Sequence, residues 1–409
     1  MLSDEQKQNL LYDLFRAFDS MKKWKATNKS IIAFELDPEK EILKLHHQLT
    51  TDTYCVSPYT CFLIHDPVPR EIFAPHIRDR IIHHFIYGQI IGIIEGIFLD
   101  NSYACRAGKW THYGIHSIKK MMRAVSDNYT KEARISKNDI SWYFMSIDKA
   151  ILIDIVYQTL SEHTAQLKYP LQRFFNLIKD IITNDPTKQY YRIGEPESWR
   201  IFPKQKSLFA SKPWTGLPLG NLTSQIFANM YLHQLDVFIT KTLGIRRYGR
   251  YMDDFVLMHR DRLYLQNCIK QIEHFLEETL HLQLHPKKRY FQPIQHGVIF
   301  CWVNIRPHYI TPCTRAIGRW KKKIHEQMGH PPNSYKEWES VRSIFNSYLG
   351  MMKHWSTYRL RNHMLSLLPV SRHNHIRYKH PFNKTTLKLK KAKRKFKQNL
   401  YIFYKLFWW

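Results

Sequence analysis

Apolar positions recur along the chain with two different spacings, and together they predict a protein that mixes helices and strands. Residues 1–45 are polar, and their pattern is helical. Residues 51–80 instead hold short apolar runs separated by four prolines, which is typical of strands and turns. Further helices are predicted over residues 81–99, 112–128 and 149–182.

The middle of the chain places acids beside short apolar runs. The stretch "NDISWYFMSID" predicts a short strand that begins at Asp139. Residues 216–243 open with a Gly/Pro turn and continue with apolar residues at helical spacing. Asp253 and Asp254 then lie between two short β-type runs, and this pattern predicts a hairpin.

The remaining pattern predicts a helix, more strands and then a basic helical region. The helix is expected over about residues 263–280 and the strands over about residues 282–310. From residue 315 the pattern is helical and basic, with one apolar face formed by Phe345, Leu349 and Met352. We therefore expect an α+β fold without internal repeats.

One apolar run has nearly the length needed to span a bilayer. This run, residues 81–99, contains His83, His84, Gln89 and Glu95. Polar groups at these positions favour a helix buried in a soluble protein, so no membrane partner is expected.

The charge of the chain changes the picture more than its apolar content does. The formal net charge is +28, and no Asp or Glu follows Glu339. Such an excess of Lys and Arg predicts a polyanionic partner, either nucleic acid or an anionic membrane surface. The 58 aromatic residues (24 Tyr, 23 Phe and 11 Trp) supply flat faces for stacking on bases, although most are expected in the core.

Cysteine usage and the N-terminus indicate the compartment. The six cysteines form no C-x-x-C pair and no Cys/His arrangement with zinc spacing. The N-terminal stretch "MLSDEQKQNLLYDLF" is amphipathic and lacks the apolar centre of a signal peptide. Reduced thiols in a cytoplasmic protein are therefore expected.

Adjacent carboxylates inside an apolar segment need an explanation. Buried acids repel each other, and they stay charged together only where a cation neutralises them. A hairpin turn directs Asp253 and Asp254 towards one point, and a third acid, Asp139 or Asp148, would complete an oxygen-rich Mg²⁺ site. The alternative is a solvated β-turn, which is the commoner meaning of a bare Asp-Asp pair.

The residues around the pair favour the metal site. "YMDD" resembles the catalytic motif of reverse transcriptases. Five further stretches resemble motifs of that family in the same order over about residues 50–361. They are "PVPREIFAPHIRDRIIHH" with "SYACRAGKWTH", "NDISWYFMSID", "GLPLGNLTSQIFANMYLHQLD", "LHLQLHPKKRYFQPIQHGVIF" and "FNSYLGMMKHWSTYRLR".

Within the family, the second motif is similar to that of diversity-generating retroelement reverse transcriptases. Most other members carry Gln-Gly there, with Ser-Pro four residues on, whereas this chain has Leu219-Gly220 and Ser224-Gln225. Some bacterial reverse transcriptases that defend against phage share this pattern, so it does not separate the two groups.

The resemblance implies a right-hand polymerase with an antiparallel palm sheet and a helical thumb. We expect the thumb to be followed by a basic extension, and see no segment long enough for an RNase H or integrase domain. The expected parts are an N-terminal helical segment (1–50), fingers (51–135), a palm (136–310) with a fingers insertion (about 150–215), a thumb (311–370) and a basic aromatic tail (371–409).

The same resemblance implies the catalytic residues. Asp139 and Asp253 are the expected main ligands of two Mg²⁺ ions, with Mn²⁺ as the alternative ion, and Asp254 is the weaker third ligand. Lys288 matches a lysine that protonates the departing pyrophosphate, although Lys287 is its neighbour and a solvated turn is the alternative. Asp148 is expected to cap a helix.

The resemblance to reverse transcriptases also implies the residues of the nucleotide pocket. Phe144 is the expected wall under the sugar that excludes a 2′-hydroxyl, with a plain core phenylalanine as the alternative. Gly220 lets the backbone approach the base pair. Leu219 replaces an amide near the nucleotide, and low fidelity is the hypothesis that follows, with ordinary fidelity as the alternative. The remaining expected pocket residues are Gln225, Tyr251 and Met252.

Two arginines in the fingers stretch are candidates for gripping the triphosphate. Arg70 matches the family position better than Arg78 does. Either guanidinium could instead hold a neighbouring carboxylate, Glu71 or Asp79.

The end of the chain combines positive charge with aromatic rings. The last stretch, "KLKKAKRKFKQNLYIFYKLFWW", suits contacts to phosphates together with stacking on bases. Binding to a structured RNA is the favoured interpretation, and docking of the aromatic end on the thumb or on a partner protein is the alternative.

The predicted function is an RNA-directed DNA polymerase that copies a structured noncoding RNA into cDNA with dNTPs, as in diversity-generating retroelements. The resemblance also implies a small accessory protein, with a homo-oligomer as the alternative assembly. One rival is a phage-defence enzyme with a dedicated noncoding RNA and repetitive or untemplated DNA product. Another is an inactive RNA-binding scaffold, and an RNA polymerase using rNTPs is disfavoured by Phe144.

Overall fold

The computed structural model describes residues 2–23, 29–65, 68–328, 335–366, 376–379 and 386–389. It divides into two compact units, each built from two segments of the chain. The first unit comprises Met1–Gly114 and Ser136–Phe291, and the second comprises Ile115–Ile135 and Gln292–Trp409.

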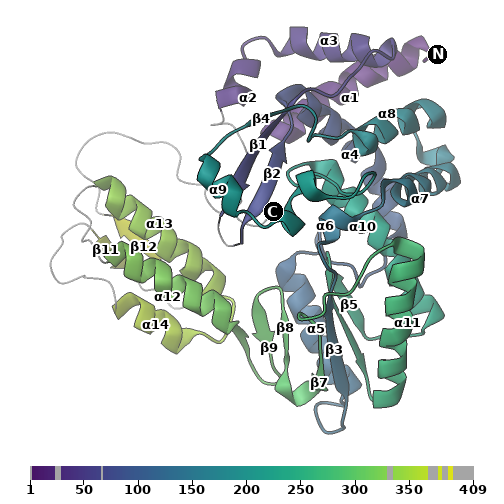
Figure 1. The fold of residues 1–409 in the computed structure, drawn as a ribbon. Coiled ribbons are helices and arrows are strands. Elements are labelled where there is room, and N and C mark those ends of the chain that lie inside the picture. The colour runs from purple at the N-terminus through teal and green to yellow at the C-terminus, as the bar shows by residue number, and fades with distance from the viewer. Residues whose placement is uncertain are drawn as a thin grey trace. The chain divides into compact units, whose positions relative to one another are not determined.

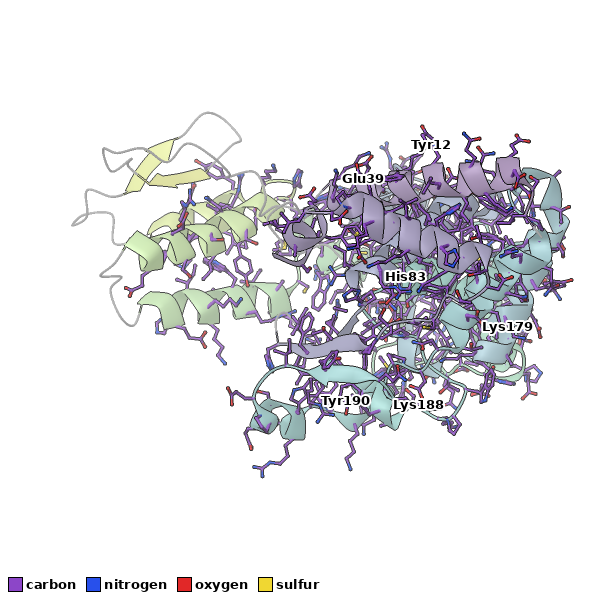
Figure 2. All side chains as sticks on the ribbon, turned by 90° about the horizontal axis from the view of Figure 1, so that it is seen from above. Tyr12, Glu39, His83, Lys179, Lys188 and Tyr190 are labelled. Atoms are coloured by element: carbon purple, nitrogen blue, oxygen red, sulfur yellow. The ribbon has the colours of Figure 1, made fainter. Side chains whose placement is uncertain are left out.

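Helices make up most of the first unit. α1 begins with a capping box in which Ser3 and Gln6 exchange side-chain and backbone hydrogen bonds, and it packs on α3 and α4. α4 is buried along much of its length, as expected, and His83 lies in the interior whereas Tyr12 and Glu39 point outward (Figure 2). The helices are α1 (Asp4–Lys22), α2 (Lys29–Phe34), α3 (Pro38–Thr50), α4 (Ile77–Ile97), α6 (Tyr143–Ser146), α7 (Lys149–Glu162), α8 (Leu171–Thr183), α9 (Pro196–Ile201), α10 (Leu222–Val237) and α11 (Arg262–Leu280).

Short turns of helix connect these elements. The single helix predicted over residues 149–182 is wrong, because a 3-10 turn, η1 (Thr164–Gln166), and Pro170 separate α7 from α8. Pro170 lacks an N–H group and stands at the start of α8. The other short turns are η2 (Lys204–Lys206), η3 (Leu208–Ala210), the π-helical η4 (Phe238–Thr242) and, in the second unit, η5 (Ile294–His296).

A three-stranded sheet pairs the proline-rich segment with a distant strand. β1 (Tyr59–Ile64) runs antiparallel to β2 (Arg70–Ala74) and parallel to β4 (Tyr190–Arg192), in the order β2-β1-β4. Arg70 pairs with Ile64 at the end of the β1–β2 ladder where the chain passes from one strand to the other. Lys188 and Tyr190 mark the return of the chain to this sheet (Figure 2).

A four-stranded sheet carries the predicted acids. Its order is β5-β6-β3-β7, and α11 packs on β6 (Figure 1). β5 and β6 form the predicted hairpin, with Tyr251 paired with Asp254 across a two-residue turn. The strands are β3 (Arg134–Asp139), β5 (Tyr248–Tyr251), β6 (Asp254–His259) and β7 (Tyr290–Pro293).

The strand predicted to begin at Asp139 instead ends there. β3 runs from Arg134 to Asp139, and the apolar residues after it form a turn and the short helix α6. Ser136, Lys137 and Asn138 are buried although they are polar, so the strand does not show in the hydrophobic pattern.

The second unit has a separate helical core, which confirms the apolar face expected on α13. Phe345, Leu349 and Met352 are buried with Trp320 and Met364. Most of the expected aromatic tail lies outside the described residues. The elements are α5 (Thr111–Val125, which starts in the first unit), β8 (Val298–Phe300), β9 (Val303–Ile305), β10 (Ile310–Pro312), α12 (Thr314–Met328), α13 (Tyr335–Met352), α14 (Tyr358–Ser366), β11 (Ile376–Lys379) and β12 (Thr386–Leu389).

Two further predictions concern the helix cap at Asp148 and the possibility of a membrane-spanning helix. Asp148 caps α7, since its Oδ1 accepts hydrogen bonds from the amides of Ala150 and Ile151, so the predicted helix cap is confirmed. In the described part of the chain, every helix is too short or too polar to cross a membrane.

Candidate active site

The end of β3 lies against the turn of the β5–β6 hairpin. The amide of Ile140 donates a hydrogen bond to the carbonyl oxygen of Asp253 at 3.2 Å. The carbonyl oxygen of Asp139 accepts from the amide of His285 at 2.7 Å. These backbone contacts bring together acids that lie more than a hundred residues apart in the sequence.

Two lysines surround the acids. Nζ of Lys137 lies 3.2 Å from Oδ1 of Asp254 and 3.8 Å from Oδ2 of Asp139. Nζ of Lys288 donates to the other oxygen of Asp139, Oδ1, at 2.9 Å. Sequence reasoning named Lys288 but missed Lys137, which stands two residues before Asp139 and therefore on the same face of β3.

Burial and mutual repulsion make these acids reluctant to ionise. Burial, followed by the charge of Asp139, raises the pKa of Asp253 to about 6. Burial raises the pKa of Asp254 to about 7, with Lys137 opposing and Asp253 adding to the shift. A cation that approached these groups would favour their charged forms.

The donor set fits a divalent cation by its chemistry, since it offers three carboxylates from adjoining strands. Oδ1 of Asp254 is shielded from solvent, and its contact with Nζ of Lys137 at 3.2 Å is an ion pair without the geometry of a hydrogen bond. Even so, no three His, Cys, Asp or Glu side chains gather as metal ligands among those residues. The acids are neighbours whose charges are compensated by lysine ammonium groups, and ligation of a metal requires some side chains to turn.

A buried arginine fixes the hairpin turn. The guanidinium of Arg250 forms two hydrogen bonds with the carboxylate of Asp236, at 2.7 and 2.5 Å. It also donates to Oδ1 of Asn229 at 3.0 Å, to Oγ of Ser102 at 3.1 Å and to the carbonyl oxygen of Met252 at 3.1 Å. The φ angle of Met252 is +54°, a value that a side chain with a Cβ rarely adopts, so this network stabilises a strained turn.

Phe144 lies on α6, the short helix that follows Asp139. It is partly buried and packs against the main core, and its carbonyl oxygen accepts from the amide of Leu217 at 2.8 Å. The hydroxyl of its neighbour Tyr143 donates to the carbonyl of Ala228 on α10. The backbone of Phe144 is thus tied to the segment that leads into α10.

The Leu219-Gly220 pair docks on β2. The amide of Phe73 donates to the carbonyl oxygen of Leu219 at 2.8 Å. The φ angle of Gly220 is +119°, and a Cβ built there would lie 2.8 Å from the carbonyl oxygen of Phe73 and 3.0 Å from a methyl group of Ile72. Only glycine fits this position without a shift of the backbone.

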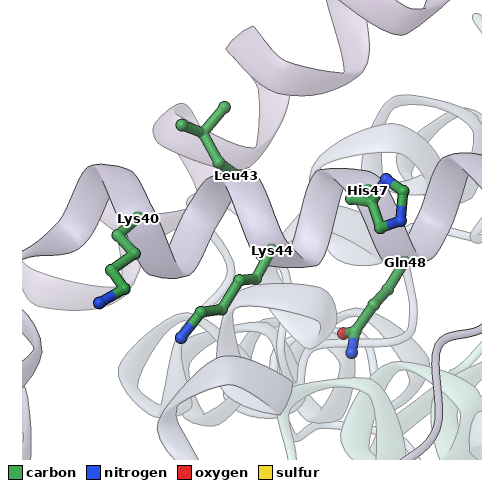
Figure 3. A pocket seen from close by; sticks show the side chains of 5 residues that line it. All are labelled: Lys40, Leu43, Lys44, His47 and Gln48. Atoms are coloured by element: carbon green, nitrogen blue, oxygen red, sulfur yellow. The ribbon is translucent and has the colours of Figure 1, made fainter.

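The two arginines of the fingers stretch have different surroundings. Arg78 donates from Nη2 to Gln48 at 2.6 Å and lies over the ring of Tyr54. Gln48 itself lines a surface pocket on α3 together with Lys40, Leu43, Lys44 and His47 (Figure 3). Arg70 is exposed and forms no ion pair in the described part of the chain, so it is the arginine left available to a ligand.

A further cation, Lys206 on η2, was missed by sequence reasoning. Burial, then repulsion from Lys288 and Arg70, lowers the pKa of Lys206, so these three positive groups lie close enough to repel one another. The buried carboxylate of Glu71 anchors the segment, because it accepts from Oγ of Ser207 at 2.8 Å and from the next amide at 2.7 Å. Glu71 is therefore engaged with this segment rather than with Arg70.

The other predicted pocket residues lie within the same unit. Oε1 of Gln225 accepts from Sγ of Cys105 at 3.4 Å, and the hydroxyl of Tyr251 accepts from Thr111 at 3.2 Å. Tyr251 and Met252 form the end of β5 and the turn after it, next to Asp253.

Comparisons with known proteins identify the family. Residues 69–300, more than half of the chain, match the family described as "Reverse transcriptase (RNA-dependent DNA polymerase)". The Group II intron-encoded protein LtrA of Lactococcus lactis subsp. cremoris is 24% identical over 258 residues, which cover 62% of this chain and 37% of that relative. Apo telomerase from Candida tropicalis is similar at a TM-score of 0.46 with 10% identity, over 64% of this chain and 49% of that chain. Telomerase from Candida albicans, in complex with a TWJ fragment of telomeric RNA, has a TM-score of 0.44 with 10% identity, over 76% of this chain and 55% of that chain. The chain belongs to the reverse transcriptase family.

Proposed function

We propose that the protein is an RNA-directed DNA polymerase whose active centre is formed by Asp139, Asp253 and Asp254. The observation that carries this proposal is the hydrogen bond from the amide of Ile140 to the carbonyl oxygen of Asp253, which joins the end of β3 to the "YMDD" turn. The chain spans 37% of the curated relative that it matches, so its activity is inferred from its own site together with its family.

The three acids supply the negative charge that nucleotidyl transfer requires. Bound divalent cations would activate the primer hydroxyl and stabilise the negative charge of the departing pyrophosphate, and Mg²⁺ or Mn²⁺ suits carboxylate ligands. Asp139 and Asp253 hold such cations in this proposal. The ammonium of Lys288, which lies 2.9 Å from Asp139, is then placed to give a proton to the pyrophosphate as it leaves.

The incoming triphosphate is bound by Arg70, Lys206 and Lys288 in this proposal. Arg70 offers a planar guanidinium, which matches phosphate oxygens, and Lys206 and Lys288 add ammonium groups. Like charges at one place repel, and a polyanion relieves that repulsion. This arrangement supports a phosphate-binding role for Arg70 and leaves Arg78 to the contacts that it makes with α3.

The sugar and base of the nucleotide lie over α6 and the Gly220 turn in this proposal. Phe144 forms the wall that excludes a 2′-hydroxyl, which favours dNTPs over rNTPs and speaks against an RNA polymerase. Gln225, Tyr251 and Met252 complete the pocket. Leu219 offers no amide to the base pair, and we infer looser checking of the pair than a glutamine would give.

The template is a structured noncoding RNA, and the product is cDNA. The net charge of +28 supports a polyanionic partner, and the pattern of Leu219-Gly220 with Ser224-Gln225 supports the diversity-generating branch. A small accessory protein belongs to that branch, and a homo-oligomer is the other assembly compatible with the sequence. A phage-defence role with repetitive or untemplated DNA product shares the same motif, and sequencing the RNA and DNA that copurify with the protein separates the two roles.

Primer extension on a defined RNA template tests the proposed activity. We expect the wild-type protein with Mg²⁺ and dNTPs to extend a DNA primer, and the product to be sensitive to DNase. Asp253→Asn should abolish extension without changing the thermal unfolding midpoint by more than a few degrees, because it removes charge and not volume. A wild-type protein that binds RNA but incorporates no dNTP would instead identify an inactive RNA-binding scaffold.

A further inference from the structure

The three acids of the site have unequal surroundings. Asp254 has the ammonium of Lys137 at 3.2 Å. Asp139 has that same ammonium only at 3.8 Å and makes its closer contact, at 2.9 Å, with Lys288. Asp254 is thus the acid that Lys137 compensates most directly.

The two lysines also differ in their freedom to move. The side chain of Lys137 is 9% exposed and comes from the interior of β3, between neighbouring strands of the sheet. The side chain of Lys288 is 53% exposed and comes from the turn before β7. Lys288 can leave Asp139 and be hydrated, whereas the buried Lys137 would keep only its longer contact with Asp139 if it left Asp254.

We propose that Lys137 is a fixed counter-ion for Asp254, and that divalent ions are held by Asp139 and Asp253 alone. This inference rests on the proposed function. It assigns a positioning role to a lysine that lies two residues before the acid at the end of β3, and it explains how three neighbouring carboxylates coexist.

Simple electrostatics supports this assignment. Removing one partner of a buried ion pair leaves an uncompensated charge, which is strongly destabilising. A divalent ion that took Asp254 from Lys137 would also bring two positive charges close to a buried ammonium. The loss of an ion pair with Lys137 disfavours Asp254 as a ligand and does not apply to Asp253, which forms no ion pair with Lys137 in the described part of the chain.

Metal binding by the full-length protein tests the inference without relying on activity. Mn²⁺ is titrated into the wild type and the single variants Asp253→Asn, Asp254→Asn and Lys137→Met, and free Mn²⁺ is followed by its paramagnetic resonance signal. We expect Asp253→Asn to weaken binding at least about tenfold, as loss of a ligand should, and Asp254→Asn to change it by less than about threefold. We expect Lys137→Met to tighten binding, because it frees Asp254 to act as a ligand.

The double variant Lys137→Met/Asp254→Asn separates a counter-ion from a merely structural lysine. It should not show the gain in Mn²⁺ affinity that Lys137→Met shows. In the presence of chelator, its thermal unfolding midpoint should be higher than that of Lys137→Met and closer to that of the wild type. Lys131→Met removes an exposed lysine, paired with Asp127 on the surface, and should leave both readouts unchanged.

Several results would overturn the inference. They are equal losses of Mn²⁺ affinity in Asp254→Asn and Asp253→Asn, additive effects of the two substitutions in the double variant, or a wild type that binds no Mn²⁺. Failure of the proposed function can be told apart from failure of this inference. A wild type that binds Mn²⁺ as expected but incorporates no dNTP would refute the polymerase function and leave the counter-ion role of Lys137 intact. If Lys137→Met fails to fold, the comparison of Asp254→Asn with Asp253→Asn still decides.

Discussion

Nη1 of Arg250 donates a hydrogen bond to the carbonyl oxygen of Met252 at 3.1 Å. This contact ties the turn of the "YMDD" hairpin to a guanidinium that is fully buried and bound to Asp236 on α10. The turn that carries the acids is thereby held by α10, the helix that precedes the hairpin in the chain. Rigid support of this kind is what a catalytic constellation needs.

Arg250→Met should destabilise the protein by about 3–5 kcal/mol, because it leaves the carboxylate of Asp236 buried without its partner. Urea unfolding measures the free energy directly. Arg246→Met, which removes an exposed arginine four residues earlier, is the matched control and should change that free energy by less than about 0.5 kcal/mol. Equal effects of the two substitutions would show that Arg250 does not support the hairpin.

Gly220→Ala should cost about 1–3 kcal/mol, since alanine at a φ of +119° is strained and its Cβ meets the carbonyl oxygen of Phe73. If the enzyme is active, the KM for dNTP should also rise, because the backbone moves away from β2. Thermal unfolding and steady-state kinetics are the measurements. Gly88→Ala on α4, where a Cβ meets nothing within 4 Å, should be neutral or slightly stabilising.

Phe144→Ala should allow the enzyme to incorporate ribonucleotides, because the small side chain leaves room for a 2′-hydroxyl. The ratio of kcat/KM for dNTP to that for the matching rNTP is the readout in primer extension. Met145→Ala, at the next residue of α6, should leave the ratio unchanged. Continued exclusion of rNTPs by Phe144→Ala would make Phe144 an ordinary core residue.

Lys206→Gln should raise the KM for dNTP about tenfold, the loss expected when one charge-assisted contact to phosphate is removed, with a smaller change in kcat. Lys206→Arg should retain most of the affinity. Lys204→Gln removes an exposed lysine from the same 3-10 turn and should have no effect. If Lys204→Gln and Lys206→Gln behave alike, the effect is one of general charge and not of a phosphate contact.

The metal-free protein should lose stability as the pH rises from about 4, the pKa of an unfolded aspartate, to about 7. Burial raises the pKa values of Asp253 and Asp254 to about 6 and about 7 in the folded protein. An acid with a higher pKa when folded keeps its proton longer than in the unfolded chain, so its contribution to stability is lost as the pH passes through the folded pKa. Urea unfolding in chelator measures this slope, which should be smaller for Asp254→Asn; an unchanged slope would assign the effect to other groups.

The hairpin was predicted because two short β-type runs bracket Asp253 and Asp254, and the structure confirms it. The cap formed by Asp148 followed from a local rule and is also confirmed. The position of β3 was predicted wrongly because its residues Ser136 and Lys137 are polar but buried. They are stabilised by contacts with nearby positions or with groups from other strands, and a hydrophobic pattern does not reveal such contacts.

Lys206 shows a second limit of sequence reasoning. Its position depends on hydrogen bonds from Ser207 and the following amide to Glu71, a contact between segments more than a hundred residues apart. Neither segment has a sequence motif that predicts this contact. Local rules predict caps and turns, whereas the long-range pairing that brings charges together emerges only from the folded chain.

An anomalous difference map from crystals grown with Mn²⁺, a primer–template duplex and a non-hydrolysable dNTP tests the central claim most directly. We predict Mn²⁺ peaks between the carboxylates of Asp139 and Asp253, beside the triphosphate, with Lys137 still paired with Asp254. Mn²⁺ bound elsewhere, or carboxylates of Asp139 and Asp253 too far apart to share an ion, would contradict the account.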